Sequence, residues 1–109
     1  MKMLLPVLML TLCALRPAAA DEPLSDTQAF NLLQKYGCQS CHALDGGQGG
    51  PSYRAIAREY SSDPSAIDYL QSSVLNGSSG VFGDSAMPGT DVPGADLRAM
   101  INWILQLQL

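Results

Sequence analysis

The chain has 109 residues, 47% of them hydrophobic, with ten acidic side chains against six basic ones. This length limits the protein to one small domain, which buries only a modest core. The acidic balance argues against nucleic acid as a partner and against docking on anionic lipid.

The first twenty residues have the pattern of a secretory signal peptide. Lys2 precedes an apolar run over residues 3–15, and Arg16 separates that run from three alanines at 18–20. The run is shorter than the about 20 apolar residues that cross a bilayer, and the small residues suit a signal peptidase. We therefore predict a signal peptide over residues 1–20, cleavage after Ala20 and no stable membrane insertion afterwards.

Cleavage changes both the charge and the number of cysteines. Removing Lys2 and Arg16 leaves four basic residues against ten acidic ones in residues 21–109, a net charge of −6. Cys13 leaves with the apolar run, so the mature domain keeps two cysteines in an oxidising compartment. A domain of this size often needs a disulfide, a metal or a cofactor to hold it together.

A capping box begins the first predicted helix. Ser25 offers an N-cap hydroxyl, and Gln28 follows three residues later. Apolar residues then recur at i, i+3, i+4 and i+7 before Gly37 ends the helix: Ala29, Leu32, Leu33 and Tyr36. The first helix therefore leads directly into Cys38.

Two more helices follow a glycine-rich loop over residues 45–51. The same apolar spacing recurs over residues 53–60 and predicts a short second helix. Asp63 and Pro64 are expected to start a third helix, as its N-cap and first residue, and Gly77 follows its end.

A long loop and a last helix complete the chain. Residues 77–94 show little periodicity and many glycines and prolines, and a loop of this length is usually functional. The last helix starts between Val92 and Asp96 and carries the apolar stripe Leu97, Met100, Ile101, Ile104 and Leu105, with Trp103 alongside. No stretch shows sustained strand alternation, so the predicted fold class is all-α with about four short helices.

The stretch Cys38-Gln39-Ser40-Cys41-His42 admits three chemistries. A redox disulfide site belongs at the start of a helix after a strand, whereas this motif follows a helix. A structural zinc site needs four ligands, and residues 21–109 hold no other cysteine or histidine. The C-x-x-C-H pattern is typical of covalent haem attachment, in which the two thiols form thioethers and the histidine ligates the iron.

Three motifs in this order resemble the class I c-type cytochromes, most of all the short monohaem bacterial members: Cys38-Gln39-Ser40-Cys41-His42, Gly50-Pro51 and Met87-Pro88. The resemblance covers essentially all of residues 21–109. It implies one haem c bound through Cys38 and Cys41, His42 and Met87 as axial iron ligands, and a Pro51 carbonyl that holds the His42 ring. It also implies that the first and last helices cross and pack together.

The assignment of Met87 is supported by elimination. Met1, Met3 and Met9 leave with the signal peptide, and Met100 lies on an apolar helix stripe, where core filling is the default. Met87 instead lies in the loop, with no helical face to bury it. Thr90 is interpreted either as a donor to the Met87 sulfur or as a plain turn residue.

The resemblance also marks two departures. Relatives often place a tryptophan, and sometimes an arginine, near the haem propionates, and the corresponding positions here hold Phe82 and Ser73. Neither supplies a comparable charged or indole donor. We therefore expect weaker neutralisation of the propionates and a lower or more pH-sensitive reduction potential.

The function expected from the resemblance is electron transfer in the periplasm, without enzymatic activity. The protein is expected to act as a monomer that exchanges electrons with redox proteins, such as a cytochrome complex, a nitrite reductase or a terminal oxidase. The alternative is a haem-binding subunit, sensor or enzyme with a labile sixth ligand. Lys35 is the one lysine in residues 21–109, so docking is expected through an apolar rim, over residues 47–50 and 81–87, against a neutral or basic partner.

Overall fold

The computed structural model describes residues 2–4, 6, 9–11, 13 and 22–109. The cleavage site predicted after Ala20 lies outside these residues. Within the described part of the chain, no helix has both the length and the apolar character needed to cross a membrane.

The first helix begins as its capping box predicts. Helix α1 spans Asp26–Lys35, the Ser25 hydroxyl accepts from the Gln28 amide at 3.2 Å, and the Gln28 side chain accepts from the Ser25 amide at 2.9 Å. Ala29 and Leu33 are the buried members of its apolar stripe. A 3₁₀ turn, η2 (Cys38–Ser40), follows almost at once.

Helix α2 spans Tyr53–Tyr60, the range that the apolar spacing predicts, and is capped by the Ser52 hydroxyl, which accepts from the Ala55 amide at 3.0 Å. Helix α3 spans Ala66–Asn76 and ends at Gly77, as expected.

The predicted start of α3 is wrong. The Asp63 carboxylate accepts from the amide of Ser65 at 2.9 Å and from its hydroxyl at 2.7 Å. Asp63 and Pro64 therefore belong to a turn that precedes the helix, and the helix begins at Ala66 with Ser65 as its N-cap.

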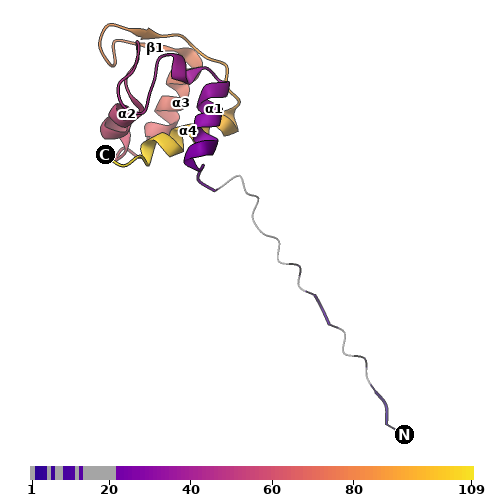
Figure 1. The fold of residues 1–109 in the computed structure, drawn as a ribbon. Coiled ribbons are helices and arrows are strands. Elements are labelled where there is room, and N and C mark those ends of the chain that lie inside the picture. Colours follow the sequence, from indigo (N-terminus) through magenta and orange to yellow (C-terminus); the bar gives the residue numbers. More distant parts are fainter. Residues whose placement is uncertain (1, 5, 7–8, 12, 14–21) are drawn as a thin grey trace.

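The loop after α3 folds back on itself as a two-stranded antiparallel pair, which the sequence did not suggest. Strand β1 (Ser78–Ser79) pairs with β2 (Ala86–Met87), with Ser78 opposite Met87. Two residues in each strand are too few to produce a visible alternation of apolar and polar side chains. In Figure 1 this loop arches over one end of the helices.

Helix α4 (Gly94–Leu105) packs against α1, α2 and α3 and passes among them in Figure 1. Its buried residues make up about half of the core: Leu97, Met100, Ile101, Trp103 and Ile104. The expected packing of the first helix on the last is confirmed. Two long-range hydrogen bonds join them, from the Tyr36 hydroxyl to Asp96 at 2.5 Å and from the Trp103 indole to Asp26 at 3.0 Å.

Candidate functional site

One cavity collects all five residues that the sequence singled out: Cys38, Cys41, His42, Pro51 and Met87. Its walls come from every helix and from the β1–β2 loop, and they are mainly aliphatic and aromatic. None of the lining residues is an aspartate, glutamate, lysine or arginine. Such a cavity suits a large apolar group held by a few polar atoms.

The two cysteines and the histidine share one turn of backbone. The Cys38 carbonyl accepts from the amide of Cys41 at 3.3 Å and from that of His42 at 3.0 Å. Both cysteines are free thiols, Cys38 half-buried and Cys41 exposed. Burial raises the pKa of the Cys38 thiol above its usual value. The turn thus presents two thiols and an imidazole to the same cavity.

The His42 ring is held by the backbone of the following loop. Its Nδ1 lies 2.6 Å from the Pro51 carbonyl oxygen. A carbonyl can only accept, so Nδ1 carries the proton and donates, which leaves the Nε2 lone pair free. The imidazole is therefore prepared to bind a metal ion through Nε2, in the way that hydrogen bonds to the other nitrogen prepare metal-binding histidines.

Gly50 permits this arrangement, a role that sequence reasoning did not assign. A β-carbon at Gly50 would lie 2.7 Å from His42 Cε1 and 3.0 Å from Nδ1, closer than side chains normally approach. The ring therefore packs directly on the Gly50 backbone. The only signal in the sequence is a glycine immediately before Pro51.

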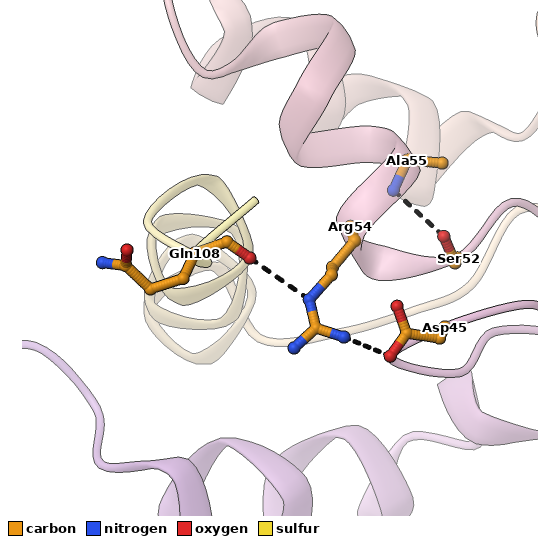
Figure 2. A network of polar contacts seen from close by, with 5 residues as sticks. All are labelled: Asp45, Ser52, Arg54, Ala55 and Gln108. Carbon is orange, nitrogen blue, oxygen red and sulfur yellow. Dashed lines mark hydrogen bonds and ion pairs between the residues drawn. The ribbon is translucent and has the colours of Figure 1, made fainter.

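Polar contacts around Arg54 anchor the loop that carries Pro51. Figure 2 shows the Arg54 side chain reaching between Asp45, with which it forms an ion pair, and the carbonyl of Gln108. The Arg54 Nε donates to that carbonyl at 3.2 Å. Ser52 caps α2 in the same view, so the loop is fixed at both of its ends.

The two methionines of residues 21–109 occupy different environments. Met100 is 2% exposed and belongs to the core cluster, as its place on the helix stripe predicts. Met87 is half-buried in β2, and its residue lines the cavity that His42 also lines. The Thr90 hydroxyl lies 3.5 Å from the Pro88 carbonyl oxygen, at the far limit of a hydrogen bond, so both interpretations of Thr90 stay open.

Tyr53 lines the cavity and buries a polar hydroxyl group there, which the sequence did not predict. Its side chain is 2% exposed, its ring stacks on His42 with centroids 5.8 Å apart, and its hydroxyl is buried without a hydrogen-bond partner. Burial, and secondarily the nearby Cys38, raise the pKa of this phenol. The apolar spacing over residues 53–60 includes Tyr53 but does not show which apolar position meets the histidine.

Together these features fit haem c. Two thiols on one turn match the two vinyl groups at one edge of a porphyrin. His42, whose Nε2 is free, lines the same cavity as Met87, whose side chain is a thioether. The apolar walls match the porphyrin faces. The residues present therefore fit the covalent attachment and the apolar faces of the expected group.

Comparisons with known proteins agree with this arrangement. Residues 27–108 match the family described as Cytochrome c. Cytochrome c-551 of Allochromatium vinosum is 40% identical over 77 residues, which cover 70% of this chain and 82% of that protein. Cytochrome c-552 of Hydrogenobacter thermophilus is 35% identical over 77 residues, covering 71% and 79%. The crystal structure of wild-type Nitrosomonas europaea cytochrome c552 aligns with a TM-score of 0.69 at 36% identity, over 72% of this chain and 99% of that one.

Proposed function

The chain belongs to the cytochrome c family as a small class I member, and from this membership we propose that it is a periplasmic electron carrier with His42 and Met87 as axial ligands. The fold is the all-α class I cytochrome c fold, and the cofactor is one covalently attached haem c. When bound, haem c supplies an iron that takes up or releases one electron. The proposal concerns what the residues of this chain do around it.

Each site residue has a distinct role in this proposal. Cys38 and Cys41 tether the haem, and His42 offers Nε2 to the iron while Pro51 holds its other nitrogen. Met87 offers a soft thioether, which favours the reduced metal and so raises the reduction potential. The cavity walls exclude water from the porphyrin.

The observation that carries the proposal is the bond from His42 Nδ1 to Pro51. It leaves one imidazole nitrogen available in a cavity that Met87 also lines. If both His42 and Met87 hold the iron, no position would remain for a substrate, and this favours a carrier over a haem enzyme or sensor.

Carbon monoxide binding tests the filled sixth position. We expect the ferrous protein to bind carbon monoxide slowly and weakly, and Met87→Leu to bind it rapidly. Haem that stays with the chain in denaturing electrophoresis checks the covalent attachment. Rapid binding by the unaltered protein would instead support the sensor or enzyme with a labile sixth ligand.

Residues 1–20 are proposed to direct export and to be removed. The support is the sequence pattern of a short positive start, an apolar run and small residues before Asp21. Mass spectrometry of the haem-loaded protein from a periplasmic extract should give a chain that starts at Asp21. A chain that still starts at Met1 would contradict the proposal.

The partner is proposed to dock on the apolar rim over residues 47–50 and 81–87. Val81 and Phe82 are 46% and 39% exposed, and a shallow groove joins Phe82 and Ser85 to Gly49, Gly50 and Pro51. Two of the four basic side chains in residues 21–109 are already paired, Arg54 with Asp45 and Arg98 with Asp68. The surface therefore offers little positive charge for an acidic partner.

The salt dependence of the electron-exchange rate tests whether the partner is basic. Electron exchange with a basic redox protein should slow as salt is added, because screening weakens the attraction. An exchange rate that rises with salt would contradict the proposed attraction between this acidic protein and a basic partner.

A further inference from the structure

The end of helix α3 and the segment that carries Met87 meet backbone to backbone. A β-carbon at Gly77 would lie 2.8 Å from the Met87 carbonyl oxygen and 3.0 Å from the Gly89 nitrogen. A β-carbon at Gly89 would lie 2.8 Å from the Leu75 carbonyl oxygen and 3.2 Å from the Asn76 carbonyl carbon. Neither neighbour is a flexible side chain, so any larger residue must displace one of the two backbones.

Hydrogen bonds hold the two segments in this contact. The Thr90 amide donates to the Val74 carbonyl at 2.8 Å, and Ser78 pairs with Met87 in the β1–β2 ladder. Met87 itself and Thr90, three residues later, are therefore both tied to the end of α3 or to the residues that follow it directly.

We infer that Gly77 and Gly89 are positioning residues that determine how far Met87 reaches into the cavity. This inference rests on the proposed role of Met87 as an axial ligand. Helix α3 packs on α4 through the core, whereas residues 79–86 are exposed. An added methyl group therefore shifts the Met87 segment more readily than the helix. A displaced segment would present the Met87 thioether less well to the iron.

A simpler explanation for Gly77 is its backbone conformation, which has φ of +83° and disfavours other residues. Gly80 and Gly83 allow the effect of a positive φ to be distinguished from the effect of the close backbone contact. They have φ of +73° and +84° in the same loop, and a β-carbon at either would have nothing within 4 Å. Gly89 gives the complementary case, because it makes the close backbone contact without a positive φ.

The test is imidazole binding to the ferric, haem-loaded protein, since imidazole competes with the methionine for the iron. We expect Gly77→Ala and Gly89→Ala to bind imidazole about tenfold more tightly, equivalent to about 1.4 kcal/mol. Their midpoint potentials should also be more negative, because a weakened thioether favours the reduced iron less. The control Gly80→Ala, which lies outside the proposed docking rim, should match the unaltered protein in both measurements.

Two outcomes overturn the inference, and only one of them also overturns the proposed ligand role of Met87. If Met87→Leu gains imidazole affinity while Gly89→Ala does not, the positioning role is wrong and the ligand role of Met87 stands. If Met87→Leu binds imidazole no better than the unaltered protein, Met87 is not the ligand, and the proposed ligation falls with the inference. Gly89→Ala carries no φ strain and keeps the test available if Gly77→Ala does not mature.

Discussion

His42 donates a hydrogen bond from Nδ1 to the Pro51 carbonyl oxygen over 2.6 Å, and its ring rests on the backbone of Gly50. The bond fixes the tautomer, and the glycine allows the ring to approach the loop closely enough to form it. The orientation of the proposed iron ligand therefore depends on the loop over residues 45–51 as much as on the motif that contains His42.

Replacing Gly50 with alanine tests this dependence. The new methyl group would meet His42 at 2.7 Å, so the ring or the loop must move. We expect the free energy of unfolding to fall by about 1–3 kcal/mol, as overpacking usually costs, with displaced NMR signals from the His42 ring. Gly94→Ala is the matched control, because its methyl would meet only the Gln71 side chain at 3.7 Å. Unfolding curves that coincide for the two variants would contradict the account.

The hydrogen bond from Trp103 to Asp26 is predicted to stabilise the contact of α1 with α4. The indole lies in the core, 7% exposed, and packs edge-on against Phe30 with centroids 5.3 Å apart. A double-mutant cycle with Trp103→Phe and Asp26→Ala should give a coupling of about 1 kcal/mol in denaturant unfolding. The cycle removes the separate effect of Asp26 on the first turn of α1. A coupling near zero would show that the bond contributes nothing to stability.

Alkaline pH is predicted to destabilise the fold. The hydrogen bond from Tyr36 to Asp96 raises the pKa of Tyr36, and burial raises the pKa values of Tyr53 and Tyr60. A phenol in the unfolded chain has a pKa of about 10. The unfolded chain therefore releases these protons first, and stability that is complete below that pH is lost as pH rises through the folded-state values.

Tyr36→Phe checks the contribution of one phenol to this loss. The variant should be less stable at neutral pH and should lose less stability than the unaltered protein as the pH rises above about 10. Chemical unfolding at a series of pH values measures both quantities. An unchanged alkaline slope would contradict the proposed role of the bond from Tyr36 to Asp96.

Phe82 is predicted to lower the reduction potential because its side chain has no hydrogen-bond donor for a haem carboxylate. Its ring is 39% exposed, lines the cavity, and lies edge-on to Tyr60 with centroids 6.4 Å apart. No charged residue lines the cavity, so a haem carboxylate would find only neutral partners among the lining side chains. Phe82→Trp adds an indole donor and should make the midpoint potential more positive. Phe82→Leu adds none and should leave the potential unchanged. A redox titration of Phe82→Trp that shows no shift would count against the hypothesis.

The sequence predicted the parts of the site that local chemistry determines. Cys38, Cys41 and His42 are adjacent in the chain, and the helix boundaries follow from apolar spacing and caps, apart from the start of α3. There Asp63 binds the Ser65 backbone and side chain, and a sequence pattern does not distinguish such a turn from a helix cap.

The parts that the sequence did not predict depend on the approach of distant segments. The role of Gly50 follows from the position of a ring eight residues earlier, and that of Gly89 from the end of α3. The buried Tyr53 hydroxyl and the β1–β2 pair likewise arise from tertiary packing. Periodicity identifies the buried face of each element but not the partner that it meets.

The central claim is that Met87 ligates the haem iron, and the ferric absorption spectrum tests it most directly. Ferric c-type cytochromes with methionine ligation show a weak long-wavelength band. We expect this band in the unaltered protein and in Met100→Leu, which conserves volume in the core, and we expect its loss in Met87→Leu. A band that persists in Met87→Leu, or that is absent from the unaltered protein, would contradict the account.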